Sequence, residues 1–569
     1  MQATSNLTHN RISLSFACFG LACLLLAGCL VWLQVVKHDH YLRLADRIQH
    51  RSIVLTAPRG IICDRLGVPL AISTTGKSIF ADPSQITDRQ GTARQLAPLL
   101  GTTEAELVPL LGRDTCYVML QRRADPGVVR EIERRMRKHA TRLRGIGLAP
   151  EPMRLYPRGA LGCHVLGFVD SNSRGAGGVE STFERVLHGR DGRVVAEIDA
   201  RGRIIPGRRV EERQPVPGRP VTLTIDARIQ EAAEQALAHA MQETKAAGGT
   251  VLVADPGSGE ILALANWPAY DPNHYAQFPT AYWNNNAVTC PYEPGSTFKL
   301  VTAIAALEEG VVRPGQIAVN CQGAKPVGRR TVHCHDGRHH GALDLRGIII
   351  ESCNIGAATL GLRLGRQRLE KYVRQLGFGA RSGLELGGET AGYVAPLPEW
   401  KDITVANVAF GQGVSVTPVQ LLAAYCAVAN GGVLPRLHLV ARVGSGEQAR
   451  ANAPLGRRVM SPGTAALLRQ YLEDVVTEGT GSRAVVPGYV AAGKTGTAQK
   501  APYGSGRHVG SFVGFVPADK PRLAILAMID EPKGDYYGGL VAAPVFAEVA
   551  KLSLAQLSVP PAPVARRPR

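Results

Sequence analysis

The chain begins with one long apolar run that does not recur. Residues 13–36 are apolar apart from serines and one glutamine. As a helix this run would measure roughly 36 Å, more than a hydrocarbon core about 30 Å thick. We therefore predict a transmembrane anchor over residues 13–36 and a short cytoplasmic segment over residues 1–12. The string Leu26-Ala27-Gly28-Cys29 also resembles a lipoprotein cleavage box. Because hydrophobicity continues beyond Cys29, we favour an uncleaved anchor.

The region after the anchor mixes extended and helical patterns. Extended stretches occur at residues 59–72 and from residue 154, and helical patterns occur around residues 90–111 and 126–140. The region has few aromatic residues and no cluster of catalytic residue types. We predict a non-catalytic pedestal over residues 37–213, which ends in a Pro-rich linker at residues 214–220.

The remainder of the chain predicts a sheet covered by helices. Residues 250–254 and 261–266 form one candidate hairpin, and residues 512–516 and 523–529 form another. Helical patterns start near residue 225, fill the middle, and return at residues 541–557. This order predicts an α+β domain with an antiparallel sheet over residues 221–558. The Pro-rich, basic tail at residues 559–569 is expected to be disordered.

What the basic charge of the chain implies depends on the compartment in which the chain resides. The net charge of +18 and the pI near 9.6 would favour nucleic-acid binding in a cytosolic protein. An ectodomain on a membrane anchor instead meets anionic lipid head groups and wall polymers, so we predict no nucleic-acid partner.

Of the eleven cysteines, eight lie outside the anchor. Cys321 and Cys334 flank a candidate loop, and a disulfide between them is our single prediction of a bridge. Several histidines lie nearby, but their spacing matches no regular ligand frame, so we interpret this segment as a polar loop and predict no metal.

The strongest chemical signal is Ser296 followed three residues later by Lys299, where an apolar helix begins. Residues at this spacing share one helix face. The amine of Lys299 can then take the proton of the Ser296 hydroxyl, which makes serine a useful nucleophile. A capping serine with a surface lysine is the ordinary alternative. The apolar surroundings of Lys299 argue against it, since burial lowers the pKa of a lysine toward that of a base.

Two further motifs follow in order. Ser352-Cys353-Asn354 precedes a helical pattern, where the serine could relay a proton and the asparagine could hold an amide. The segment Lys494-Thr495-Gly496-Thr497 reads as a strand that could pair with an extended peptide. Gly496 allows close backbone approach, and Lys494 with the threonine hydroxyls suits a carboxylate.

These three motifs, in this order, resemble the transpeptidase domain of class B penicillin-binding proteins. Further blocks of the family pattern are similar at residues 59–67, 154–157, 178–180, 411–420 and 536–539. The chain length and single anchor are most similar to septal, division-specific transpeptidases. An elongation-specific enzyme is the alternative within the class.

The resemblance implies a serine β-lactamase-like fold with a five-stranded antiparallel sheet. It implies a serine-type D-Ala-D-Ala transpeptidase that cross-links peptidoglycan stem peptides, is acylated by β-lactams and needs no cofactor or metal. The implied catalytic residues are Ser296, Lys299, Ser352, Asn354 and Lys494, and the implied substrate-binding residues are Thr495, Gly496 and Thr497. A membrane glycan polymerase and other divisome proteins are the implied partners. The implied location is the bacterial inner membrane, with the catalytic domain in the periplasm.

Two rival functions are also compatible with these motifs. One is a hydrolase of the same fold, either a D,D-carboxypeptidase or a β-lactamase. No stretch resembles the glutamate loop that class A β-lactamases need for deacylation. The other is a penicillin-binding sensor or scaffold without catalysis. The complete motif set argues against an inactive scaffold, and a cytoplasmic segment of residues 1–12 offers no signalling output.

Overall fold

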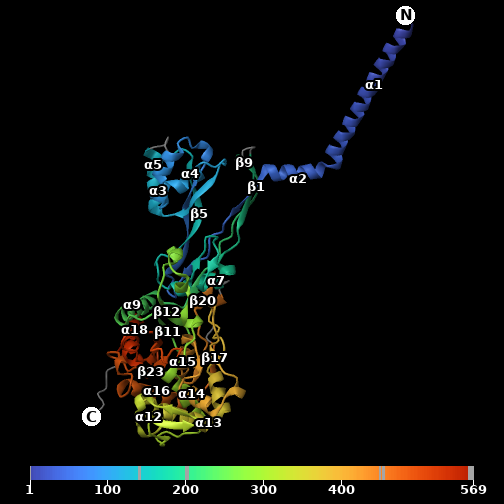
Figure 1. Cartoon of the computed structure of the whole chain (residues 1–569). Coiled ribbons are helices and arrows are strands. Elements are labelled where there is room, and N and C mark those ends of the chain that lie inside the picture. The colour runs from blue at the N-terminus through green and yellow to red at the C-terminus, as the bar shows by residue number, and fades with distance from the viewer. Residues whose placement is uncertain (1, 139–142, 199–203, 447–449, 452–454, 562–569) are drawn as a thin grey trace. The chain divides into compact units, whose positions relative to one another are not determined.

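The computed structural model describes residues 2–138, 143–198, 204–446, 450–451 and 455–561. The chain folds into two compact units, neither of them a single continuous stretch. The smaller comprises Met1–Pro58, Thr75–Pro152 and Arg190–Pro217, and the larger comprises Arg59–Thr74, Met153–Gly189 and Gly218–Arg569. Figure 1 colours the elements along the chain.

The smaller unit starts with the predicted apolar helix. Helix α1 (Gln2–Val31) continues into a π-helical turn, η1 (Trp32–Val36). The span His9–Val36 has a mean hydropathy of 2.4 and none of it is buried, which fits a membrane anchor. A second apolar stretch, Gly538–Gln556, is more than half buried and belongs to the core of the larger unit.

The rest of the smaller unit contains short helices and twisted strands. Its elements are α2 (His38–Gln49), β1 (His50–Leu55), η2 (Pro83–Gln85), α3 (Arg89–Leu100), α4 (Glu104–Leu111), β4 (Val118–Ala124), α5 (Pro126–Lys138), β8 (Gly192–Ile198) and β9 (Ile204–Arg213). Strands β3 (Pro69–Ala81) and β5 (Ile146–Leu155) each have residues in both units. The helical pattern at residues 90–111 is two helices, not one. Thr103 and Glu106 form a capping box that starts α4 anew.

The sheet of the larger unit has five antiparallel strands in the order β12-β11-β25-β24-β23. The strands are β11 (Gly248–Ala254), β12 (Ile261–Trp267), β23 (Ala492–Gln499), β24 (His508–Val516) and β25 (Leu523–Asp530). Both predicted hairpins are present, as β11–β12 and β24–β25. The predicted five-stranded antiparallel sheet and the α+β class are therefore confirmed.

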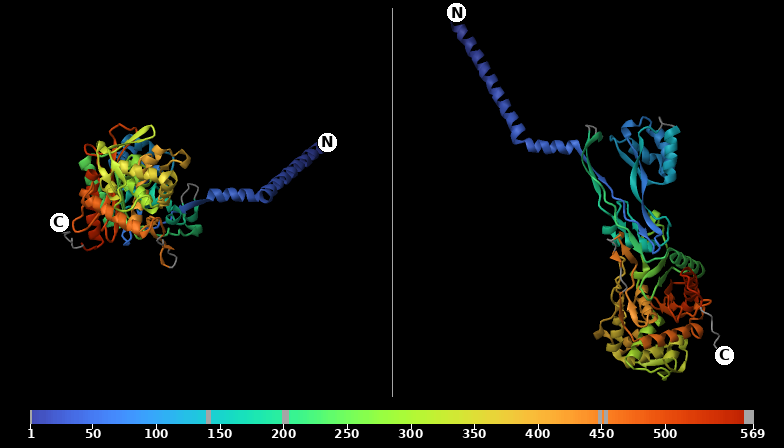
Figure 2. Two further views of the ribbon diagram at one scale, coloured as in Figure 1. Left: turned by 90° about the horizontal axis from the view of Figure 1, so that it is seen from below. Right: turned by 180° about the vertical axis from the view of Figure 1, so that it is seen from behind.

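Helices cover both faces of this sheet. Alternate residues of β11 belong to different cores: Val251 and Val253 pack with α9 (Ala227–Thr244) and α18 (Ala543–Gln556), whereas Leu252 and Ala254 face the other core. Figure 2 shows the red helix α18 beside the green helix α9. The second core contains α11 (Lys299–Glu308), α15 (Pro418–Ala429) and α16 (Pro462–Thr477).

Further helices and strands complete the larger unit. Those before the first sheet strand are β2 (Ile62–Cys63), α6 (Cys163–Leu166), β6 (Phe168–Val169), β7 (Gly175–Ala176), α7 (Gly178–Thr182), α8 (Glu184–Leu187) and β10 (Val221–Leu223). Those between the hairpins include α10 (Asn286–Thr289), β13 (Val319–Cys321), β14 (Ala324–Val327), β15 (Arg330–His333), β16 (Gly341–Leu343), α12 (Leu345–Ile350), α13 (Asn354–Gln375), β17 (Tyr393–Val394), α14 (Asp402–Ala409), β18 (Val414–Ser415), β19 (Val433–Pro435), β20 (Val440–Val443), β21 (Arg450–Ala451) and β22 (Gly456–Arg458); α17 (Gly538–Val541) precedes α18. Of the tail predicted to be disordered, residues 562–569 lie outside the described residues. Val559 accepts a hydrogen bond from Tyr489 (2.6 Å).

Three of the family-like blocks meet in a buried ion-pair cluster. Glu180 is fully buried, and its carboxylate accepts hydrogen bonds from Arg59 Nη2 at 2.8 Å and from Arg154 Nε at 2.6 Å. Glu184, which is partly exposed, lies 2.8 Å from Arg59 Nη2. Burial alone would lower the pKa of Arg59, but the two carboxylates raise it above its ordinary value. This cluster ties together segments that are far apart in the sequence.

Candidate active site

Ser296 lies in a tight turn that the sequence builds with a glycine. The residues Gly295–Phe298 form a 3-10 turn, η5, which leads directly into α11. Ser296 thus precedes the α-helix rather than lying in its first turn. Gly295 has φ +54°, and a Cβ there would lie 2.9 Å from the carbonyl oxygen of Thr497. Glycine is therefore required where this turn meets β23. The Ser296 side chain remains half-buried, so a substrate can reach it.

Lys299 is the centre of the site. Its Nζ atom lies 2.8 Å from Ser296 Oγ, 2.6 Å from the carbonyl oxygen of Ser352, 3.1 Å from Ser352 Oγ and 2.7 Å from Asn354 Oδ1. Only 1% of Lys299 is exposed. A single amine therefore brings together four of the predicted catalytic residues, including itself.

The protonation of Lys299 follows from its surroundings. Burial lowers the pKa of Lys299 to about 7, and the sulfurs of Cys353 and Cys334 oppose that shift. About half of the amine is therefore neutral and able to act as a base near pH 7, whereas an exposed lysine would be almost fully protonated.

The turn Ser352-Cys353-Asn354 connects α12 to α13. Ser352 adopts φ +54°, a left-handed conformation that is uncommon for residues other than glycine. The Cys353 sulfur accepts a hydrogen bond from the Gly356 amide (3.2 Å) and so caps α13. The Asn354 amide group donates to the carbonyl oxygen of His333 (3.1 Å). This bond turns Asn354 Oδ1 toward Lys299.

Strand β23 carries the third motif, as predicted. Lys494 is 1% exposed, and its Nζ donates to the carbonyl and hydroxyl oxygens of Thr495, both at 3.3 Å. Burial and the charge of Lys299 lower the pKa of Lys494 well below its ordinary value. A Cβ on Gly496 would lie 2.5 Å from Ser511 Oγ and 2.9 Å from Thr297 Cγ2. Glycine therefore allows β23 to approach the serine turn closely.

The hydroxyls of Thr495 and Thr497 on β23 are held by two further residues. Thr480 was not identified from the sequence, and Gly538 was included only within the family-like stretch 536–539. Thr480 Oγ1 lies 2.8 Å from Thr495 Oγ1, and the Gly538 amide donates to Thr497 Oγ1 at 3.1 Å. Tyr425, fully buried in α15, donates its hydroxyl hydrogen to the carbonyl oxygen of Thr297 (2.9 Å). No local pattern marks Thr480 or Tyr425, because each acts from a distant segment.

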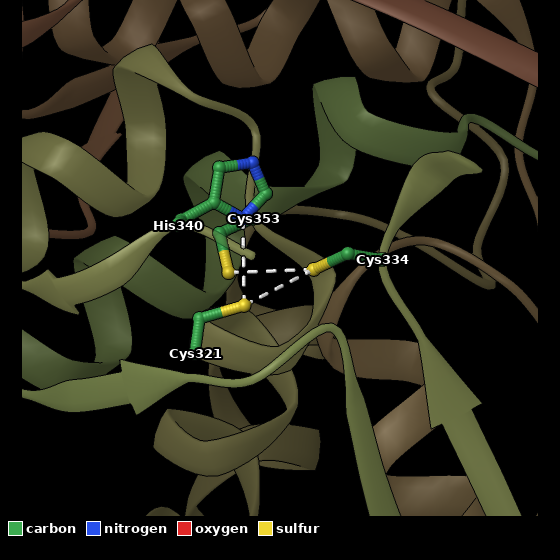
Figure 3. Close-up of side chains that lie close together, drawn as sticks. All are labelled: Cys321, Cys334, His340 and Cys353. Atoms are coloured by element: carbon green, nitrogen blue, oxygen red, sulfur yellow. Dashed lines mark hydrogen bonds between the residues drawn. The ribbon is translucent and has the colours of Figure 1, made fainter. Parts of the chain in front are cut away.

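The predicted disulfide between Cys321 and Cys334 is not formed. Both are free thiols, and their Sγ atoms lie 3.6 Å apart. Cys353 and His340 join them, as Figure 3 shows. The bridge prediction was wrong because these thiols belong to a larger cluster, and the polar-loop interpretation missed it.

Comparisons with known proteins identify the family of this chain. A family model described as "Penicillin binding protein transpeptidase domain" matches residues 249–551, and "Penicillin-binding Protein dimerisation domain" matches residues 54–223. "Stage V sporulation protein D" of Bacillus subtilis is 34% identical over 98% of this chain and 87% of its own length. "Peptidoglycan D,D-transpeptidase FtsI" of Escherichia coli K12 is 31% identical over 98% of this chain and 93% of its own length.

A solved structure agrees with these matches. Penicillin binding protein 3 from Mycobacterium tuberculosis, complexed with aztreonam, superposes with a TM-score of 0.68 at 28% identity, covering 90% of this chain and 98% of that one. Together with the five-stranded sheet and the three assembled motifs, the matches extend over nearly the whole sequence. The chain therefore belongs to the class B penicillin-binding proteins, which join a dimerisation domain to a penicillin-binding transpeptidase domain.

Proposed function

We propose that this chain is a serine peptidoglycan D,D-transpeptidase and that Ser296 is its nucleophile. The observation that carries the proposal is the arrangement around Lys299. A neutral amine has two N–H donors and one lone pair. Two of its neighbours, the Ser352 carbonyl oxygen and Asn354 Oδ1, can only accept hydrogen bonds. They take the two N–H groups, so the lone pair is left for the hydroxyl hydrogen of Ser296.

The first half-reaction follows from this arrangement. Ser296 Oγ attacks the carbonyl carbon between the two terminal D-alanines of a stem peptide while its proton passes to Lys299. Backbone N–H groups of Ser296 and Thr497 stabilise the oxyanion. The C–N bond then breaks, and the proton reaches the departing D-alanine amine through Ser352, 3.1 Å from Lys299. Asn354 orients the peptide.

The second half-reaction forms the cross-link. The amine of a second stem peptide attacks the acyl carbon and loses one proton to Lys299 through Ser352. The ester C–O bond then breaks, and Lys299 returns that proton to Ser296 Oγ. Lys494, Thr495 and Thr497 hold the terminal carboxylate of the donor, while Gly496 leaves room for the strand-like substrate. β-Lactams acylate Ser296 because they mimic the donor. The aztreonam complex of a related protein supports this part of the proposal.

We assign the chain's parts as follows. Residues 13–36 anchor it in a bacterial inner membrane, residues 1–12 are cytoplasmic, residues 37–213 form the pedestal, residues 214–220 link it to the transpeptidase domain at residues 221–558, and residues 559–569 are a tail. The catalytic domain acts in the periplasm, where its substrate lies. The family-model matches at residues 54–223 and 249–551 support the division into two folded parts.

We further propose a septal role, with a membrane glycan polymerase and divisome proteins as partners. Matches over 98% of this chain with the FtsI transpeptidase and with Stage V sporulation protein D support it. A fluorescent fusion should gather at midcell. A signal spread along the sidewall would instead favour lateral wall synthesis.

Replacing the nucleophile tests the chemistry directly. Ser296→Ala should abolish covalent labelling by fluorescent penicillin and leave the melting temperature nearly unchanged, because a half-buried hydroxyl contributes little to stability. Thr302→Ser, one turn along α11, is the matched control and should label normally. Intact-mass analysis that finds an adduct on Ser296→Ala would overturn the assignment. Steady turnover of a chromogenic cephalosporin, in place of a single burst, would favour a hydrolase.

A further inference from the structure

Four side chains from four separate segments converge beside the proposed proton relay. Cys321 ends β13, Cys334 follows β15, His340 precedes β16, and Cys353 is the middle residue of the turn between α12 and α13. Their ligand-type atoms all lie within 4.8 Å of one another. Figure 3 shows the three sulfurs and the imidazole pointing toward one common centre.

The separations match those of a tetrahedral zinc site. Zn–S bonds of about 2.3 Å and Zn–N bonds of about 2.0–2.1 Å place ligand atoms roughly 3.8 Å (S to S) and roughly 3.5 Å (S to N) apart around a tetrahedral ion. Cys334 Sγ lies 3.6 Å from both Cys321 Sγ and Cys353 Sγ, and Cys321 Sγ lies 3.4 Å from His340 Nδ1. Three thiols and one imidazole form a set that soft, tetrahedral metals prefer.

Disulfide bonding accounts for this cluster poorly. The cluster contains three cysteines, so a single disulfide would not explain why the third thiol and the imidazole lie at the same place. All three cysteines are buried, at 1%, 4% and 0% exposure for Cys321, Cys334 and Cys353. The Gly356 amide also donates to Cys353 Sγ, an outer hydrogen bond of the kind that supports a metal-bound thiolate.

We propose that Cys321, Cys334, His340 and Cys353 bind one structural zinc ion. All four positions are filled by protein ligands, so the site is closed and performs no chemistry of its own. It fastens the segment of residues 321–340 to the turn that carries Ser352 and Asn354.

The position of Cys353 suggests what the ion does for the reaction, and this part rests on the proposed function. Cys353 lies between Ser352, which holds a left-handed backbone, and Asn354, which bonds to His333. Both neighbours contact Lys299. Zinc at Cys353 would hold this turn in the conformation that presents both side chains to the amine, so the ligands are positioning residues and not catalytic ones.

Metal content of the full-length protein tests the site without reference to activity. Protein purified with a reductant and without chelators should contain about one zinc ion per chain. Cobalt added to the metal-free protein should give the visible bands of a tetrahedral thiolate complex. Cys321→Ala and the half-buried His340→Ala should lose the metal. Cys426→Ala, which changes an equally buried cysteine in α15, should keep it.

Further readouts separate this inference from the proposed function. Ser296→Ala should retain zinc although it cannot be acylated. Chelation should slow penicillin acylation of the wild-type protein by about a hundredfold, the scale of a displaced catalytic group, and added zinc should restore the rate. A wild-type protein without zinc or cobalt binding, ligand variants that keep the metal, or a non-reduced protein with a disulfide among these cysteines would each overturn the site.

Discussion

Two buried cationic clusters in the larger unit differ in how their charge is balanced. Arg59 and Arg154 surround the buried carboxylate of Glu180. Lys299 and Lys494 are buried as deeply, but among the described residues no carboxylate is hydrogen-bonded to either amine.

The difference shows in the pKa values. Carboxylates raise the pKa of Arg59, whereas burial without a hydrogen-bonded carboxylate lowers the pKa of Lys299 to about 7. A buried cation with a counter-charge stays charged, whereas a buried amine without a carboxylate can act as a base at neutral pH. Charge balance thus distinguishes a structural cluster from a chemical one.

Lys299→Met should give the largest effect on chemistry. Without a base beside Ser296, the rate of penicillin acylation should fall by about 10²–10⁴-fold. Stability should change little, because methionine fills a similar volume and no charge must be buried. Stopped-flow acylation and thermal unfolding measure the two effects. The exposed Lys371→Met provides the control. Near-normal acylation of Lys299→Met would show that the amine is not the base.

Glu180→Gln should reduce stability and leave the acylation rate nearly unchanged, the reverse of Lys299→Met. It leaves Arg154 without a counter-charge and Arg59 with only the partly exposed Glu184, and the free energy of unfolding should fall by about 3–5 kcal/mol. Folded Glu180→Gln should still be acylated at nearly the normal rate.

Glu184→Gln is the matched control for this change. Its carboxylate also contacts Arg59, but 31% of the side chain is exposed, so water compensates and the loss should be about 1 kcal/mol. Chemical denaturation ranks the two variants. A Glu180→Gln protein as stable as the wild type would mean that the cluster does not stabilise the fold.

Local patterns predicted the parts of the fold that depend on neighbours in sequence. Alternating apolar residues and tight turns predicted both hairpins of the sheet, and the motif spacing predicted the contact between Ser296 and Lys299. The helix pattern at residues 90–111 was misleading, because hydrophobic periodicity continues across the capping box that separates α3 from α4.

Local sequence patterns could not predict contacts between segments that are distant along the chain. The cluster of Cys321, Cys334, His340 and Cys353 has spacers of 12, 5 and 12 residues, counted along the chain. These fit no compact ligand motif, because each ligand comes from its own segment. The pairing of Glu180 with Arg59 and Arg154 likewise appears only after folding. Such contacts depend on how segments pack and leave no periodic trace in the sequence.

The smallest predicted effect is a dependence of the acylation rate on pH. It should follow the Lys299 cluster and not the Glu180 cluster. Protonated Lys299 cannot accept the Ser296 proton, so the acylation rate should rise with pH up to the pKa of Lys299, about 7, and then level off. Well below that pKa the rate should change about tenfold per pH unit. The charge of Lys299 also interacts with Lys494 and with the sulfurs of Cys353 and Cys334.

Glu180→Gln sharpens this test. It lies in the compensated cluster, so its acylation profile should keep the midpoint of the wild type under conditions where the variant is folded. Rates measured by stopped flow across the neutral range would decide. A wild-type profile that stays flat, or falls with rising pH, would mean that Lys299 reacts as a cation, and the contrast between the two clusters would then lose its chemical meaning.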